Sequence, residues 1–241
     1  MEKCANGNLS DDLSTKNRRY ADIMSGKNNL QAKTNKEKMI AGEFYNPIDK
    51  RLLFDRTRAR CLADRFNKTH AWNILRRTHL IKRLFPNGGK GAFFEPSIRV
   101  EYGYNVTFGK NFYMNFDCQL LDVAPIKIGD NVMFGPRVTV ATPCHPFVAD
   151  ERIAHKYEDG FHDWEYAKPV EIGDNVWIAS GVTVCGGVKI GSNSVIAAGS
   201  VVVRDIPEGV LAAGVPCKVI RKITDEDRMF EKHGIKPPCK D

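Results

Sequence analysis

The sequence lacks any run of 18 apolar residues and any short apolar stretch typical of a secretory signal. A membrane-spanning helix needs about 20 predominantly apolar residues, so we expect a protein that is neither exported nor inserted in a membrane. The seven cysteines are odd in number and contain no Cys-x-x-Cys pair. This pattern favours free thiols over a disulfide framework, and we therefore predict a cytoplasmic protein.

Two common phosphate-binding motifs are also missing. The sequence contains no Gly-x-Gly-x-x-Gly fingerprint and no Gly-Lys-Ser/Thr loop, which excludes the usual Rossmann and P-loop sites. The formal net charge of +7 suits nucleic acid, an anionic cofactor or simple solubility equally well. Arginines dominate the region 51–65, but we interpret them as the solvated face of a helix and predict no nucleic-acid partner.

A strict six-residue period is what the sequence does contain. Between 172 and 207 each block of six opens with a branched apolar residue, at Ile172, Ile178, Val184, Ile190, Ile196 and Val202. The same period begins at Tyr102, giving seven blocks before an interruption at 143–169 and six after it. A hexapeptide period predicts a solenoid in which three short strands close one coil, and these blocks make about four coils.

Together with the repeat, the sequence predicts four parts. Residues 1–33 are polar and are expected to form a disordered extension. Residues 34–90 predict a helical cap, with helices starting at Thr34 and covering about 49–66 and 69–85. Residues 91–223 form the expected β-helix domain, and its interruption at 143–169 is expected to be functional, because loops on rigid scaffolds carry sites. Residues 224–241 are expected to form a tail with one short helix over 225–233.

Six segments carry a resemblance to a known family. They are MIAGEFYNP, NFYMNFDCQLLDVAPIKIGDN, CHP, IGDNVWIASGVTV, AAGSVVVRDIP and AAGVPCKVIRKI. In this order, over residues 35–223, they resemble the maltose and galactoside O-acetyltransferases of the hexapeptide-repeat acyltransferase superfamily. The resemblance implies a mainly β protein with a left-handed parallel β-helix. It also implies a homotrimer with active sites between subunits, acetyl-CoA as co-substrate and a small sugar as acceptor.

His145 is the candidate general base. A neutral imidazole can remove a hydroxyl proton near neutral pH, and the His-Pro position matches the catalytic histidine of the family. A histidine in an ordinary loop is the alternative. A zinc site with His155 and His162 would need three histidines converging from adjacent coils, so we expect no metal. Cys144 is a poor nucleophile candidate, because adjacent residues of an extended loop point to opposite sides.

Four polar residues are candidates for contact with the acceptor. Asn115 matches the family position that holds the acceptor or the transition state, where a neutral amide can donate to an oxyanion; an asparagine at a solenoid corner is the alternative. Asp117 and Asp122 are near it in register. Asp49 follows the cap motif and matches a cap carboxylate of the family, and its alternative role is to complement a helix N-terminus.

The cofactor candidates lie mostly in the second half of the repeat. Trp177, Ser180 and Ala198 match family positions that contact coenzyme A, where small residues let the ligand approach the backbone. The family's basic positions near the phosphates correspond to Arg204, Lys218 and Arg221, since cations neutralise an anionic ligand. A solvated basic terminus is the alternative for this last group.

These features together predict an acetyl-CoA-dependent O-acetyltransferase. The acceptor would be a small sugar resembling maltose or glucose, with direct transfer assisted by His145. The interruption contains Phe161, Trp164 and Tyr166, which could reshape or cover the acceptor pocket. The alternatives are a non-catalytic trimeric scaffold and an acetyltransferase for another small acceptor, such as a xenobiotic or serine.

Overall fold

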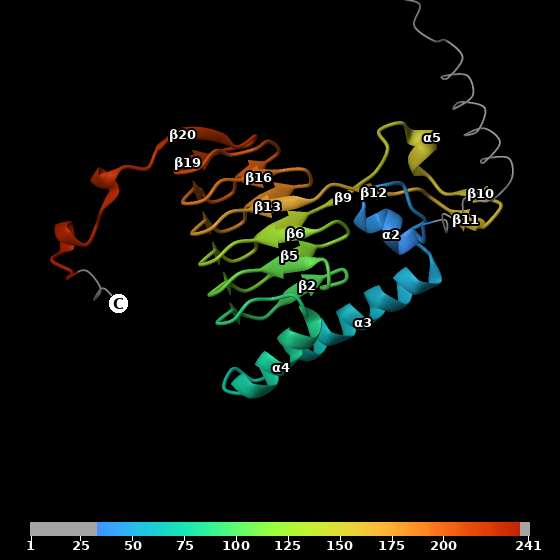
Figure 1. The fold of residues 1–241 in the computed structure, drawn as a ribbon, viewed down its shortest axis with the longest axis horizontal. Helices are drawn as coiled ribbons and strands as arrows, with labels where there is room; N and C mark the ends of the chain where they lie inside the picture. The colour runs from blue at the N-terminus through green and yellow to red at the C-terminus, as the bar shows by residue number, and fades with distance from the viewer. Residues whose placement is uncertain (1–32, 237–241) are drawn as a thin grey trace, which may run out of the picture. The chain divides into compact units, whose positions relative to one another are not determined.

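The computed structural model describes residues 33–236 (Figure 1). The predicted disordered extension therefore lies outside the described residues, apart from its last one. Within residues 33–236, no helix has both the length and the apolar content that crossing a membrane requires.

The cap contains three helices, α2 (Asn35–Ile40), α3 (Lys50–Asn67) and α4 (Ile74–Leu84). The carboxylate of Asp49 caps α3, accepting hydrogen bonds from the backbone N–H groups of Arg51 and Leu52 at 2.9 and 3.2 Å. These amides have no partner within the helix, so the cap stabilises its first turn. α4 starts five residues later than predicted, because the side chain of Asn73 caps it there.

Three parallel sheets form the solenoid (Figure 1). Sheet 1 contains β3 (Val106–Phe108), β6 (Ile126–Ile128), β13 (Val170–Ile172) and β16 (Lys189–Ile190). Sheet 2 contains β1 (Phe93–Phe94), β4 (Tyr113–Met114), β7 (Met133–Phe134), β14 (Trp177–Ile178), β17 (Val195–Ile196) and β19 (Val210–Ala213), and β20 (Lys218–Lys222) adds antiparallel to β19. Sheet 3 contains β2 (Ile98–Val100), β5 (Cys118–Leu121), β8 (Thr139–Ala141), β15 (Thr183–Cys185) and β18 (Val201–Val202). The chain takes one strand from each sheet in turn, which makes four complete coils in the described part and confirms the mainly β, coiled architecture.

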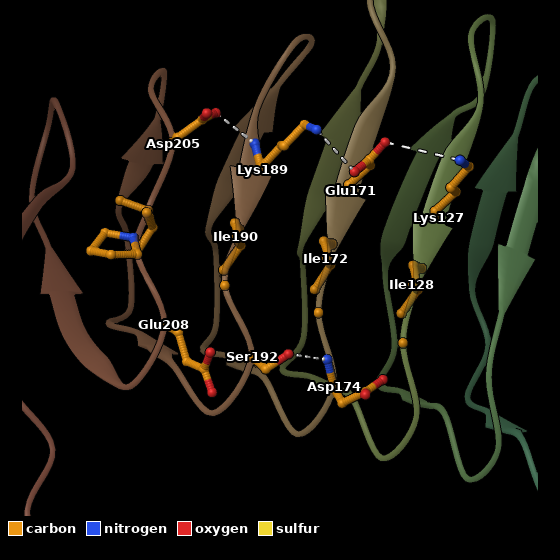
Figure 2. Close-up of a pocket in the computed structure, with 15 residues that line it drawn as sticks. Lys127, Ile128, Glu171, Ile172, Asp174, Lys189, Ile190, Ser192, Asp205 and Glu208 are labelled. Carbon is orange, nitrogen blue, oxygen red and sulfur yellow. Dashed lines mark hydrogen bonds and ion pairs between the residues drawn. The ribbon is translucent and has the colours of Figure 1, made fainter.

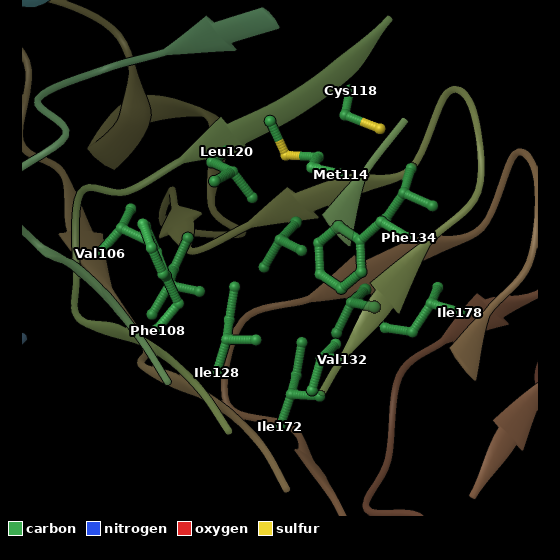
Figure 3. Close-up of a cluster of buried hydrophobic side chains, with 14 of the residues drawn as sticks. Val106, Phe108, Met114, Cys118, Leu120, Ile128, Val132, Phe134, Ile172 and Ile178 are labelled. Carbon is green, nitrogen blue, oxygen red and sulfur yellow. The ribbon is translucent and has the colours of Figure 1, made fainter. Parts of the chain in front are cut away.

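The first residue of each six-residue block fills the interior of the coils. Ile172, Ile178, Val184, Ile190, Ile196 and Val202 are all at most 4% exposed. Figure 3 shows Ile128, Ile172 and Ile178 packed with Val132 and Phe134 inside the solenoid. β-branched side chains suit this pleated interior, and burying them on stacked coils stabilises a fold that no single coil could support.

Asparagines line the corner between sheets 1 and 2. Asn111, Asn131, Asn175 and Asn193 each adopt a left-handed backbone, with φ from 55° to 61°. Their amides hydrogen-bond from one coil to the next at 3.0 Å, and the last one donates to Glu208. Asparagine tolerates this conformation better than most residues, so the ladder fixes the corner of every coil.

The interruption of the repeat is a folded excursion. It leaves the solenoid through β9 (Pro143–Cys144) and returns through β12 (Tyr166–Ala167), which pairs antiparallel with β9. Between them lie α5 (Ala149–Arg152) and a hairpin of β10 (His155–Tyr157) and β11 (Gly160–His162). In Figure 1 the excursion extends sideways from the coils, next to α2. The predicted single helix at 225–233 is instead two 3-10 helices, Asp225–Asp227 and Glu231–His233, because the backbone is extended at Arg228.

Candidate active site at the break in the coils

His145 lies between two carboxylates supplied by the return of the excursion. Its Nε2 is 3.8 Å from an oxygen of Glu165, and its Nδ1 is 4.0 Å from an oxygen of Asp163. The His145 side chain is 47% exposed, whereas those of Asp163 and Glu165 are 25% and 19% exposed. The arrangement therefore presents an accessible imidazole against half-buried carboxylates that can orient it and stabilise its protonated form.

Tyr45, in the cap, holds Glu165 in place. Its hydroxyl group donates a 2.6 Å hydrogen bond to Glu165, and the two backbones also form an antiparallel bridge. Tyr45 is completely buried. The cap and the excursion are thus joined directly beside His145.

A metal ion is the other ligand to consider for this cluster. Donor atoms of His145, Asp163 and Glu165 lie within 4.8 Å of one another. In the structure the two carboxylates approach different nitrogens of the ring. Carboxylates on either side of an imidazole can also assist proton transfer to and from the ring. Cys144 is half-buried, and burial raises the pKa of its thiol, which disfavours a thiolate nucleophile.

Two of the predicted acceptor residues, Asn115 and Asp117, lie away from His145 within one chain. Asn115 is partly exposed at the corner between sheets 2 and 3, where its amide oxygen accepts from the N–H of Phe116. Asp117 lies at the same corner and accepts from Ser97. His145 lies at the opposite end of sheet 3, where it follows β8 and β9. A strand of four residues spans about 13 Å, so one chain keeps the two predicted catalytic residues apart.

The other two predicted acceptor residues have structural contacts. Asp122 is completely buried and accepts hydrogen bonds from the backbone N–H groups of Glu101 and Tyr102. A sugar hydroxyl therefore has no exposed surface of Asp122 to contact in this chain. Asp49 uses one oxygen to cap α3 and accepts from Asn35 with the other.

The predicted coenzyme A residues divide between two corners. Ser180 and Ala198 occupy stacked turns on the Asn115 corner, where the N–H of Gly199 donates to the carbonyl of Ser180 at 2.9 Å. A Cβ atom at Gly181 or Gly199 would meet no heavy atom within 4 Å, so this ledge is open. Trp177 lies on the adjoining outer face and is 48% exposed.

The basic candidates differ in how far they are already paired. Arg204 follows β18 on the corner from which the excursion leaves, whereas Lys218 and Arg221 are on β20. The guanidinium of Arg221 forms a double hydrogen bond with Asp227, both at 2.7 Å. Arg204 and Lys218 are exposed and have no ion-pair partner among residues 33–236. The open ledge and the exposed cations fit a thiol cofactor with an anionic end.

Two further cavities lie in the structure, one along sheet 1 and one between the cap and the excursion. One of about 770 Å³ runs along sheet 1, where Figure 2 shows Lys127, Glu171 and Lys189 pointing outward in a row. Ion pairs of 3.9 and 3.3 Å already connect these three side chains. The other cavity, of about 560 Å³, lies between the cap and the excursion. It is lined by Lys38, Phe44, Pro146, Glu151, Tyr157 and Trp164.

The three aromatic residues predicted to cover the acceptor pocket differ in location and exposure. Trp164 lines the second cavity, and Tyr166 packs on Phe44 with ring centroids 5.2 Å apart. Phe161 is 65% exposed on the hairpin.

Sequence reasoning missed the carboxylates beside His145 and missed Tyr45. One signal was available, because Glu165 and Asp163 are two residues apart in an extended segment and so share a face.

Comparisons with known proteins agree with this architecture. Residues 38–89 match the maltose acetyltransferase hexapeptide capping motif, and residues 169–204 match the six-repeat bacterial transferase hexapeptide family. The chain is 40% identical to the galactoside O-acetyltransferase of Escherichia coli K12, over 80% of this chain and 92% of that protein.

Two solved structures are similar over most of the chain. A maltose O-acetyltransferase from Clostridium difficile has a TM-score of 0.75 at 44% identity, covering 81% of this chain and all of that one. A galactoside acetyltransferase in complex with coenzyme A has a TM-score of 0.74 at 40% identity, covering 81% of this chain and 94% of that one. The protein described here therefore belongs to the hexapeptide-repeat acetyltransferase family that includes the galactoside and maltose O-acetyltransferases.

Proposed function

We propose that this protein transfers an acetyl group from acetyl-CoA to a hydroxyl group of a small sugar, with His145 as the general base. The observation that carries the proposal is the accessible imidazole of His145 between the carboxylates of Glu165 and Asp163. The relatives named above act on galactosides or maltose, and one solved relative holds coenzyme A. These names support the substrate class and leave the individual sugar to be identified.

Each residue has a defined part in this proposal. Acetyl-CoA supplies the activated acetyl group as a thioester. His145 accepts the proton of the sugar hydroxyl as its oxygen attacks, and returns that proton to the departing thiolate sulfur. Glu165, held by Tyr45, orients the imidazole and stabilises its positive charge. The amide of Asn115 donates to the developing oxyanion.

The separation of these residues supports a site between two chains. In one chain Asn115 and the ledge of Ser180 and Ala198 lie on one corner, whereas His145 and Arg204 lie on the other. We propose a homotrimer in which the corner carrying Asn115 in one subunit faces the corner carrying His145 in the next. Such an arrangement has cyclic symmetry and repeats the same site three times.

The decisive experiment measures release of free CoA from acetyl-CoA with a panel of acceptors. We expect turnover with maltose, glucose or galactosides, and less with amino sugars, xenobiotics or serine. His145→Ala should lower kcat by roughly two to four orders of magnitude, while calorimetry should show that CoA still binds. His155→Ala, a substitution at an exposed excursion histidine, is the matched control. Normal turnover of His145→Ala would exclude the base, and CoA binding without turnover on any acceptor would favour the scaffold.

A further inference from the structure

The imidazole ring of His162 faces a hydrogen-bond acceptor at each of its two nitrogens. His162, at the end of β11, is 2% exposed. Its Nδ1 lies 2.8 Å from the backbone carbonyl oxygen of Asp163, and its Nε2 lies 2.8 Å from a carboxylate oxygen of Asp159. A neutral imidazole has only one N–H group, whereas the imidazolium ion has two. Only the protonated ring can donate to both oxygens.

These two hydrogen bonds connect the cap to the candidate base. The second carboxylate oxygen of Asp159 accepts from the side chain of Asn46, a buried cap residue, at 3.4 Å. On the other side, the residue whose carbonyl oxygen accepts from His162 is Asp163, and its carboxylate lies 4.0 Å from Nδ1 of His145. The ring of His162 therefore forms a second link, besides that of Tyr45 with Glu165, between the cap and the segment that carries both carboxylates of the site.

Aromatic rings surround His162 in a way that favours a cation. Tyr157 stacks on it at 4.6 Å between centroids, and Trp164 contacts it nearly perpendicularly at 4.8 Å. A cation is attracted to the face of an aromatic ring. The imidazole ring of His162 also packs against Trp164, which lines the cavity between the cap and the excursion.

The charged and polar groups near His162 also favour its protonated form. Burial alone would lower its pKa, but the hydrogen bonds to the Asp163 carbonyl and to Asp159 outweigh burial and raise the pKa above its ordinary value. The charged groups that face the ring are Asp159 and Asp163 on the excursion, and the cap contributes the neutral amide of Asn46. A pKa raised on folding stabilises the hairpin fully at low pH, and this stabilisation disappears as pH rises through the pKa of the folded state.

We propose that His162 is a positioning residue that acts as an imidazolium ion, joining the excursion to the cap and fixing Asp163 beside His145 and Trp164 in the wall of the cavity between the cap and the excursion. Its effect on turnover rests on the proposed acetyl transfer, whereas its protonation state does not. Loss of the proton would place a ring lone pair against an oxygen at 2.8 Å, so the hairpin would loosen and Asp163 and Trp164 would shift.

The protonation state can be tested without any assay of activity. The full chain, labelled with ¹⁵N-histidine, would be followed by NMR across pH, with His162→Gln identifying the signals. We expect the form with two ring N–H groups on His162 to persist to a midpoint above about 6.5, the ordinary value. A midpoint at or below the ordinary value, or a ring with a single N–H throughout, would overturn the proposal.

A second measurement links the ring to turnover. Asp159→Asn keeps an oxygen that can accept from Nε2 but removes the charge, so the midpoint of His162 should fall by about one pH unit. The pH at which kcat/KM for the acceptor declines on the alkaline side should fall by the same amount. His155→Gln, on the same hairpin, should leave both unchanged. An unchanged alkaline decline in Asp159→Asn would show that His162 does not position the site.

The two proposals can fail separately. A doubly protonated His162 in a protein that transfers no acetyl group would contradict the proposed function and leave the imidazolium in place. In that case the pH dependence of tryptic cleavage at the exposed Lys156 on β10, compared between the original protein and Asp159→Asn, reports the loosening of the hairpin. Equal cleavage of both proteins at every pH would overturn the positioning role.

Discussion

The hydroxyl group of Tyr45 donates a 2.6 Å hydrogen bond to Glu165 across 120 residues of sequence. The backbones of the same two residues pair as well, at 3.0 and 3.3 Å. Burial, together with the neighbouring Glu165 carboxylate, raises the pKa of Tyr45 far above its ordinary value, so its hydroxyl group remains a donor at any working pH. Glu165 thus has one oxygen fixed by the cap and the other 3.8 Å from His145.

Tyr45→Phe should slow the reaction without changing substrate binding. The substitution removes one hydrogen bond to Glu165 and nothing else, so we expect kcat to fall roughly tenfold, which corresponds to about 1.4 kcal/mol. Steady-state kinetics at saturating acetyl-CoA measures this change. Tyr166→Phe, in the adjoining strand, is the matched control. If kcat falls equally in both variants, the hydroxyl group of Tyr45 has no specific role in holding Glu165.

Glu165→Gln should be more harmful than Asp163→Asn. Glu165 is held on two sides, by its backbone and by Tyr45, so it is the better placed carboxylate to orient the imidazole. We expect kcat to fall roughly 10²-fold for Glu165→Gln, less than the ~10⁴-fold seen when an orienting carboxylate bonds its histidine directly. The comparison uses kcat of both variants at one pH. The reverse ranking would assign the orienting role to Asp163.

The fold was predictable because its interior repeats every six residues. Each block of six residues forms one strand on one face of a coil, and its first side chain, such as that of Ile178 or Val184, is buried inside the coil. The limits of the excursion at 143 and 169 were predictable for the same reason, since the period stops there.

The site was less predictable, because long-range contacts within the excursion form it. Pairing of β9 with β12 brings Glu165 next to His145, and no local pattern encodes that pairing. Asp122 follows a strand and resembles an exposed corner residue in sequence, yet its carboxylate turns inward to two backbone N–H groups. The start of α4 was misplaced because Asn73 acts as a cap only in the context of the preceding turn.

The asparagine ladder predicts a specific pattern of stability. Asn175 has φ of 58° and hydrogen-bonds to the neighbouring coils. Asn175→Ala should destabilise the protein by roughly 2 kcal/mol, from backbone strain and lost hydrogen bonds. Asn175→Gly relieves the strain and should cost about half as much. Urea denaturation at one fixed protein concentration compares the variants. Equal losses in both would mean that the left-handed backbone contributes nothing.

The basic residues near the ledge should contribute unequally to CoA binding. Arg204→Ala and Lys218→Ala should each weaken binding by roughly fivefold to tenfold, about 1 kcal/mol, and less at high salt. Arg221→Ala should have a smaller effect, because its guanidinium is already bonded to Asp227. Calorimetry at two salt concentrations, with Lys222→Ala as control, tests this order. A larger loss for Arg221→Ala would mean that it exchanges Asp227 for the ligand.

Asp122 should make the protein less stable as pH rises. Burial raises its pKa to about 7, although backbone N–H groups partly offset the effect. Between the ordinary carboxyl pKa and this value, the folded state holds a proton that the unfolded state has lost, so unfolding releases a proton and stability falls with pH. Ionising Asp122 in place costs up to about 4 kcal/mol above pH 7.

Asp122→Asn removes that ionisation and keeps an oxygen for the N–H groups of Glu101 and Tyr102. The variant should therefore be more stable than the original protein at pH 8, and this advantage should disappear as pH is lowered to about 4, where both side chains are neutral. Urea denaturation from pH 4 to pH 8.5 measures the difference, with the exposed Asp117→Asn as control. A difference that does not change with pH would mean that Asp122 is ionised within the fold, and that a partner outside one chain compensates its charge.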